Sequence, residues 1–204
     1  MSVPFIFLLS APSGAGKTTV ADGLIASSPR LRRVITCTTR PPRPGELNGR
    51  DYHFLTPEEF RLRVDQGDFL EHASVFGKSY GTLKRSVLDL LESGVDVLLN
   101  IDVQGAELVR QEARRDAVLG AALVTVFLGP PSLSELERRL RGRASDAEEV
   151  IRRRLDTARD EAARWTEYDY LVVSGTREED LFRMRSIYVA EGLRRDRNRY
   201  HLGQ

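Results

Sequence analysis

The segment "VPFIFLLSAPSGAGKTTV", residues 3–20, contains the features that decide the fold. Residues 3–10 form a continuous apolar run of strand length, which predicts a β-strand buried on both faces. A glycine-rich turn follows, and "KTTVADGLIASS" at residues 17–28 has a helical pattern. A buried strand that leads through such a turn into a helix is typical of a phosphate site at a helix N-terminus.

The turn itself, "APSGAGKTT" at residues 11–19, predicts binding of a nucleoside triphosphate. Its glycines allow backbone N–H groups to turn inward around an anion, and the helix end adds a partial positive charge. We expect Lys17 to reach the β- and γ-phosphates and Thr18 to place its hydroxyl on Mg²⁺. The usual pattern begins with glycine, where this chain has Ala11. The expected ATP-binding residues are Ala11, Pro12, Ser13, Gly14, Ala15, Gly16, Lys17, Thr18 and Thr19.

Outward from this segment, apolar strand patterns alternate with helical ones. Strands are predicted over 3–10, 33–38, 95–102, 122–129 and 168–174, with helices over 83–94, 103–115 and the C-terminal part of the chain. This alternation predicts an α/β P-loop fold of three layers, with a parallel core sheet of about five strands flanked by helices. Capping boxes at Thr56–Glu59 and Ser132–Glu135 are expected to begin two further helices.

Residues 36–88 have a different pattern, with short strands expected at 50–55 and 68–76 and a helix over 57–66. They are predicted to form an inserted subdomain of mixed β type. Within it, "TTRPPRPGELNGRDYHFL" at 38–55 combines three prolines with two glycines, which hold the backbone in an irregular path. Its composition alone favours a solvated loop. Beside a triphosphate site, however, Arg40 and Arg43 on a stiff loop suit the phosphate of an acceptor.

Composition limits the choice of class and compartment. The chain has 204 residues, the length of one moderate domain, and its net charge of +1 argues against a general nucleic-acid or membrane partner. The only cysteine, Cys37, excludes an internal disulfide and fits a reducing compartment, so we expect a cytoplasmic protein. The N-terminus lacks a basic leader, and its apolar run is too short to span a bilayer. The scattered histidines predict no zinc site.

A phosphate loop is compatible with a switch GTPase, a motor ATPase or a kinase for a small acceptor, and the length and the arginines favour the kinase. The segments "SAPSGAGKTT", "TTRPPRPGELNGRDYHF", "FLEHASVFG", "IDVQGA" and "PPSLSELERRLRGR" together resemble the guanylate kinase family, in the same order and spacing. The resemblance implies transfer of a phosphoryl group from MgATP to GMP. It also implies a core of residues 1–35 and 89–204, a GMP-binding insertion at 36–88 and a lid at 138–155.

By this resemblance, the phosphate of GMP is bound by Arg40, Arg43, Tyr52 and Tyr80, and its guanine by Thr36, Glu71, Thr82 and Asp102. A carboxylate such as Glu71 can accept two parallel hydrogen bonds from guanine, while the hydroxyls of Thr36 and Thr82 can donate to the oxygen and nitrogen acceptors of the base. The resemblance further implies that Arg139, Arg143 and Arg154 of the lid close over the triphosphate, as catalytic residues together with Lys17.

The chain departs from the family at several places, and two of these departures affect the assignment of site residues. Strand 95–102 ends in Asn100, Ile101 and Asp102, where the family has two acids, so Asn100 and Asp102 are assigned to Mg²⁺ only through water. Near the C-terminus, "LVVSGT" lacks the family's Asn-Asp pair beside adenine, which leaves Ser174 as the candidate contact. Two alternatives stay open: a non-catalytic guanylate-kinase-like module that binds phosphorylated peptides, and a kinase for another nucleoside monophosphate. The sequence makes no prediction of the oligomeric state.

Overall fold

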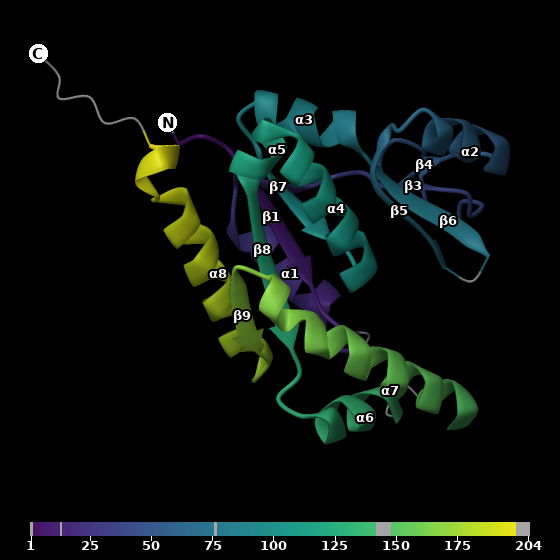
Figure 1. Cartoon of the computed structure of the whole chain (residues 1–204), viewed down its shortest axis with the longest axis vertical. Coiled ribbons are helices and arrows are strands. Elements are labelled where there is room, and N and C mark those ends of the chain that lie inside the picture. Colours follow the sequence, from purple (N-terminus) through teal and green to yellow (C-terminus); the bar gives the residue numbers. More distant parts are fainter. Residues whose placement is uncertain (1, 13, 76, 142–147, 199–204) are drawn as a thin grey trace, which may run out of the picture.

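The structure, a computed structural model, describes residues 2–12, 14–75, 77–141 and 148–198. Five strands form the core sheet in the order β2-β7-β1-β8-β9, namely Leu31–Arg33, Asp96–Asn100, Ile6–Ser10, Leu123–Gly129 and Tyr170–Val173. All neighbouring pairs are parallel, and Ile6 of the central strand is opposite both Val97 and Leu123. The predicted α/β fold with a parallel sheet of about five strands is therefore confirmed (Figure 1).

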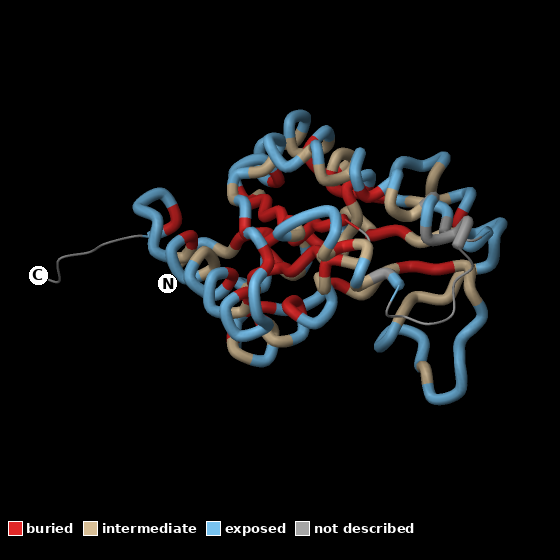
Figure 2. Tube along the Cα trace, turned by 90° about the horizontal axis from the view of Figure 1, so that it is seen from below, coloured by how far each residue is buried: buried red, intermediate tan, exposed pale blue. Residues whose placement is uncertain are grey.

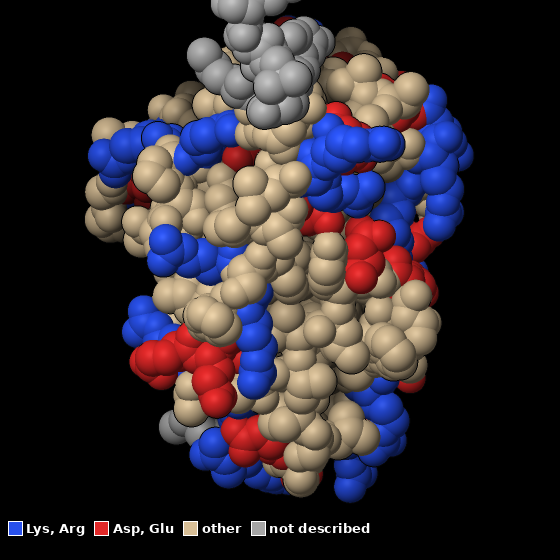
Figure 3. All heavy atoms as spheres, turned by 90° about the vertical axis from the view of Figure 1, so that its left-hand side faces the viewer, with Lys and Arg blue, Asp and Glu red and all other residues tan. Residues whose placement is uncertain are grey.

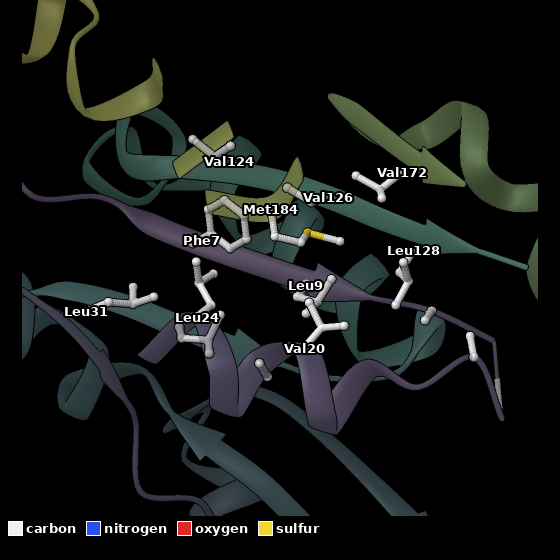
Figure 4. Close-up of a cluster of buried hydrophobic side chains, with 14 of the residues drawn as sticks. Phe7, Leu9, Val20, Leu24, Leu31, Val124, Val126, Leu128, Val172 and Met184 are labelled. Atoms are coloured by element: carbon white, nitrogen blue, oxygen red, sulfur yellow. The ribbon is translucent and has the colours of Figure 1, made fainter. Parts of the chain in front are cut away.

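Helices cover both faces of this sheet because alternate residues of β1 point to opposite sides. Phe7 and Leu9 pack with Val20 and Leu24 of α1 (Lys17–Ser27) and with Met184 of α8 (Arg177–Gly192), as Figure 4 shows. On the other face, Ile6 and Leu8 pack against helices α3 (Lys84–Glu92), α4 (Val103–Arg115) and α5 (Ala117–Ala122). The strands are thus buried on both sides, as the red tube in the middle of Figure 2 shows.

Helix α5 was not predicted from the sequence. Asp116 ends α4 and caps α5, with its carboxylate accepting hydrogen bonds from the backbone N–H groups of Val118 at 3.0 Å and Leu119 at 3.2 Å. The aspartate therefore provides a second helix start within a segment that looked like a direct connection to β8.

The second sheet has the order β4-β3-β6-β5, with strands at His53–Phe54, Cys37–Thr38, Lys78–Leu83 and Phe69–Val75. Strands β3 and β4 are parallel, whereas β6 is antiparallel to both β3 and β5, so the sheet is mixed. Helix α2 (Pro57–Asp65) begins at the predicted capping box of Thr56 and Glu59. The sheet ends at Leu83, and α3, which includes residue 88, packs in the core through Val87 and Leu91.

Two strand predictions were wrong in extent. The strand expected over 33–38 is divided between the sheets: β2 ends at Arg33, Val34 is buried in the core, and Cys37 begins β3 in the second sheet. The strand expected over 50–55 contains only His53 and Phe54, because the preceding turn uses Asn48, whose side chain accepts from the Phe54 N–H at 2.9 Å.

The second sheet has a small core of its own. Phe60 of α2 stacks on Phe69 of β5 with ring centroids 4.5 Å apart, and Cys37 is fully buried beside them. Burial raises the pKa of the Cys37 thiol to about 11. This thiol is therefore protonated and enclosed at neutral pH.

Helices α6 (Leu133–Arg141) and α7 (Glu148–Ala163) pack on each other through Leu136 and Ala158 and extend from one end of the core (Figure 1). The second predicted capping box is half formed: Ser132 accepts from the Glu135 N–H at 3.1 Å, while the Glu135 carboxylate binds arginines. Short 3-10 turns occur at Arg164–Glu167 and Arg195–Arg197. Over the face that carries α8, charges of both signs are interspersed (Figure 3). No helix among the described residues is long and apolar enough to cross a membrane.

Candidate active site

The loop between β1 and α1 forms a cradle of backbone groups. Gly14 and Gly16 have φ values of 93° and 92°, the left-handed region that favours glycine, and Gly16 is the N-cap of α1. Because Gly16 has no side chain to cap the helix, the first N–H groups of α1 are left for an anion. Ser13, one of the predicted ATP-binding residues, lies outside the described residues.

A cavity of about 360 Å³, here called the phosphate cavity, lies over this loop. Two residues from outside the loop also line this cavity: Asp102, the N-cap of α4, and Glu161 of α7. Its lining residues are Ala11, Pro12, Gly14, Ala15, Gly16, Lys17, Thr18, Thr19, Asp102 and Glu161. The structure therefore brings together the described part of the predicted phosphate loop around one cavity.

Lys17 enters this cavity from the first turn of α1. Its ammonium group donates a hydrogen bond to the carbonyl of Ile101, which holds the side chain against the end of β7. Burial lowers the pKa of Lys17 from 10.5 to about 8, although the carboxylates of Asp102, Glu161 and Glu71 act in the opposite direction. The charged form of this lysine is thus poorly solvated, and a nearby anion would stabilise it.

The end of β7 carries oxygen atoms that suit the water shell of a metal ion. The side-chain oxygen of Asn100 is buried and has no hydrogen-bond partner among the described residues. Asp102 caps α4 by accepting from the Gly105 N–H at 2.8 Å through one carboxylate oxygen. Thr18 is exposed in the phosphate cavity. Amide, carboxylate and hydroxyl oxygens of this kind fit Mg²⁺, which keeps several waters and binds mainly through oxygen ligands. Among the described residues, no group of three or more His, Cys, Asp or Glu is placed to hold a metal ion.

A second cavity, of about 270 Å³, lies between the core and the second sheet. We call it the acceptor cavity. Thr18 lines both this cavity and the phosphate cavity. The acceptor cavity is lined by three residues that were predicted to bind GMP, namely Thr36, Tyr52 and Thr82, and by two that were predicted to hold the metal, namely Thr18 and Asn100.

Glu71 lies on β5 next to this region and is only 6% exposed. The Thr82 hydroxyl donates to its carboxylate at 2.6 Å, and burial raises the pKa of the Glu71 carboxyl. Gly105 of α4 permits this placement, because a Cβ atom there would lie 3.2 Å from a carboxylate oxygen of Glu71. A buried carboxylate with a hydroxyl donor on one oxygen retains acceptor capacity for a ligand.

Arg40 is held in the loop between β3 and β4 by a carboxylate and by aromatic rings. Its guanidinium donates to Glu46 at 2.9 Å and lies 5.3 Å from the ring centroid of Tyr52. Glu46 also accepts from the backbone N–H of Arg43 at 2.7 Å. Tyr80 is in edge contact with Tyr52, with centroids 6.3 Å apart. The four residues predicted to bind the acceptor phosphate, Arg40, Arg43, Tyr52 and Tyr80, are thus connected in one group with Glu46.

The comparison with known families decides which enzymes use such a site. Residues 4–191 match the family described as Guanylate kinase. The chain belongs to the guanylate kinase family. It is 47% identical over 192 residues to the guanylate kinase of Paramagnetospirillum magneticum, covering 94% of this chain and 87% of that protein. It is also 47% identical over 194 residues to the guanylate kinase of Cereibacter sphaeroides, covering 94% and 89% of the two chains.

A solved structure agrees. The crystal structure of guanylate kinase from Anaplasma phagocytophilum has a TM-score of 0.72 to this chain at 34% identity, covering 97% of this chain and 90% of that one. The chain is therefore an enzyme of the class that phosphorylates GMP with ATP. This finding removes the alternatives of a non-catalytic module and of a kinase for another nucleoside monophosphate.

The structure describes only some of the arginines predicted for the lid. Arg139 of α6 donates to the Ser174 hydroxyl at 3.2 Å and to the Ala15 carbonyl of the phosphate loop at 3.4 Å. Arg154 lies in α7 and is not among the described residues that line the two cavities, and Arg143 lies outside the described residues. Their roles stay predictions.

Two residues of the site were not singled out by the sequence: Glu46, which holds Arg40, and Gly105, which makes room for Glu71. Glu135 was predicted only as part of a capping box, and the structure shows that it binds both Arg138 and Arg139. The hydrogen bonds from Arg138 and Arg139 hold the pKa of Glu135 at about 2. The spacing of Glu135 to the two arginines, three and four residues along a helix, is the signal that would have found it.

Proposed function

We propose that phosphoryl transfer takes place where the phosphate cavity and the acceptor cavity meet, at Thr18. The observation that carries this proposal is the presence of Thr18 in the lining of both cavities. An in-line transfer needs the attacking oxygen of the acceptor and the leaving oxygen of the donor on opposite sides of the γ-phosphorus, so the two substrates must approach one point from different sides. Two cavities that share a residue of the phosphate loop meet this requirement.

On the donor side, the N–H groups at the start of α1 and Lys17 bind the triphosphate, and Lys17 neutralises charge on the transferring group. Arg139, Arg143 and Arg154 of the lid add positive charge when the lid closes. The bond from Arg139 to the Ala15 carbonyl supports this role for Arg139, because it already brings the guanidinium to the loop.

Mg²⁺ bound with ATP would supply charge neutralisation between the β- and γ-phosphates. Thr18 would hold it directly, and Asn100 and Asp102 would hold it through water. The buried oxygen of Asn100, which has no partner in the described part of the chain, supports this assignment, since it needs a donor such as a metal-bound water.

On the acceptor side, residues 36–88 form the GMP-binding unit. Arg40, Arg43, Tyr52 and Tyr80 bind the phosphate of GMP, and Glu71 accepts from the ring N–H and the amine of guanine. Thr36 and Thr82 donate to the base, and Asp102 accepts a further amine hydrogen. The bond from Thr82 to Glu71 supports this assignment, because it orients a carboxylate that burial alone would favour in its neutral form.

The reaction needs no general base. The attacking oxygen belongs to a phosphate whose second pKa is about 6, so it is largely ionised at neutral pH. Catalysis then consists of positioning the two phosphates and neutralising their charge.

A coupled assay of ATP with GMP, AMP, CMP and UMP tests the proposal, together with Lys17→Ala. We expect GMP to be used in strong preference, and the variant to fold normally while its turnover falls at least about a hundredfold. Near-normal turnover of the folded variant would contradict the donor site proposed here.

A further inference from the structure

A third cavity, of about 440 Å³, lies on the side of the phosphate loop that faces α8. It shares Gly14, Ala15, Gly16 and Thr19 with the phosphate cavity. Its remaining walls come from Val20 of α1, from α6, from the turn after β9 and from the start of α8. A nucleotide whose phosphates lie on the loop, with the acceptor on the Thr18 side, therefore has its nucleoside in this third cavity.

The third cavity contains a buried carboxylate, Asp180, in the first turns of α8. Asp180 is 4% exposed, and its two oxygens accept from the Ser174 hydroxyl and from the Gly175 N–H, both at 2.8 Å. The nearest described cation is Arg183, at 4.0 Å. A carboxylate has about four acceptor positions, so two neutral donors satisfy only half of them.

The Ser174 hydroxyl fixes the direction of this carboxylate. It donates to Asp180 and accepts from Arg139 of α6 at 3.2 Å, so its hydrogen is committed to the carboxylate. Ser174 therefore has no further hydrogen to donate, and the remaining acceptor positions of Asp180 cannot be filled by this hydroxyl. Among the described residues, the two donors to Asp180 leave acceptor positions available to a ligand donor in the cavity.

We propose that Asp180 determines the specificity for the base of the phosphoryl donor, by accepting a hydrogen bond from the 6-amine of adenine. The proposal rests on the proposed function, which assigns the donor to the phosphate loop. A purine with a carbonyl at position 6 would bring an acceptor against the carboxylate, leaving two acceptors facing each other. Sites built around a buried polar group reject such analogues strongly.

Asp180→Asn tests the proposal through binding of ADP and IDP, whose bases differ in having an amine or a carbonyl at position 6. Calorimetry without GMP measures both affinities with no turnover. We expect the unmodified protein to prefer ADP at least about tenfold. In the variant, the amide can turn its NH₂ group toward a carbonyl, so this preference should fall at least about tenfold, with the KM for GMP unchanged.

A further variant separates base recognition from a general effect of changing charge in this helix turn. Glu178→Gln removes a charge from an exposed position of the same turn and should leave the preference for ADP intact.

An equal loss of ADP and IDP binding in Asp180→Asn would overturn the proposal, and so would loss of the preference in Glu178→Gln. No preference for ADP in the unmodified protein would overturn it as well. A failure of the proposed function looks different: the unmodified protein would bind ADP yet transfer no phosphate to GMP.

Discussion

A glutamine in place of Glu71 keeps the shape of the side chain but replaces one acceptor oxygen by a donor. Guanine presents two donors to this position, so one of them would face an NH₂ group. A bidentate contact to a base is worth about 1–3 kcal/mol, and we expect kcat/KM for GMP to fall at least about tenfold in Glu71→Gln. The KM for ATP should change much less. Steady-state kinetics with each substrate varied in turn measures both effects.

Glu58→Gln on α2 is the matched control, because it removes an exposed carboxylate from the same subdomain. Full GMP activity in Glu71→Gln would contradict the assignment of Glu71 to guanine.

The pKa of Glu71 adds a pH dependence. Burial raises this pKa, so the carboxylate is protonated at a higher pH than usual, and GMP affinity should begin to fall at a correspondingly higher pH on acidification. In the protein without GMP, this group's contribution to folding stability is present at acid pH and is lost as pH rises through the raised pKa.

The lowered pKa of Lys17 leads us to expect that the protein takes up a proton when it binds ATP at alkaline pH. With a pKa of about 8, this lysine is largely neutral at pH 8.5, and a bound triphosphate should raise the pKa and return the proton. Calorimetry in two buffers of different ionisation enthalpy should show an uptake on the order of half a proton.

The uptake should be absent in Lys17→Ala, and an equal heat in both buffers for the unmodified protein would contradict the assignment.

The lowered pKa of Lys17 also affects folding. The unfolded chain binds more protons than the folded one between about pH 8 and 10.5, so the contribution of Lys17 to stability rises with pH in that window.

At the scale of elements, the approach of α4 to β5 depends on Gly105. A methyl group there would lie 3.2 Å from a carboxylate oxygen of Glu71, so the carboxylate would have to shift by a few tenths of an ångström. We expect Gly105→Ala to raise the KM for GMP about tenfold, because small displacements at a binding group are costly. Alanine in a helix is better than glycine by about 1 kcal/mol, so thermal stability should not fall in proportion.

Gly192→Ala provides the comparison, since the same exchange in α8 meets no atom within 4 Å. It should leave GMP kinetics unchanged and the melting temperature equal or slightly higher. If Gly105→Ala kept normal GMP kinetics, the close contact between the two elements would have no part in binding the acceptor.

Elements with a strong local signal were predictable from the sequence. The buried run before the phosphate loop, the capping box at Thr56 and the apolar strand before Asn100 all correspond to observed elements. The division of residues 33–38 was not predictable, because it depends on which of two sheets accepts each residue. Val34 and Cys37 are similarly apolar, yet they are buried in different cores.

The site shows the same distinction. Lys17 and Thr18 follow from a local pattern, whereas Glu46 becomes recognisable only when the loop folds back and brings its carboxylate to Arg40, six residues earlier. Asp180 lies near the phosphate loop only through the packing of α8 against α1. Contacts of this kind depend on tertiary structure, and no periodicity along the chain predicts them.

At the scale of the whole molecule, two segments that carry arginines predicted to bind substrate lie outside the core sheet (Figure 1). One is the second sheet with its loop, which carries Arg40 and Arg43, and the other is the pair of helices α6 and α7, which carry Arg139 and Arg154. Each substrate should therefore favour a closed position of its own segment, GMP for residues 36–88 and ATP for the lid at 138–155. Small-angle X-ray scattering should give a radius of gyration that decreases with GMP, decreases with a non-hydrolysable ATP analogue, and is smallest with both. An unchanged radius with both ligands would contradict closure.

The enclosed thiol of Cys37 has a consequence for chemical labelling. It is the only sulfhydryl of the chain, it lies in the middle of the second sheet, and its pKa of about 11 keeps it protonated at neutral pH. An alkylating reagent therefore reaches it only when β3 separates from its neighbours. The rate of alkylation consequently measures the opening of this one sheet, without interference from the core, the lid or any second cysteine.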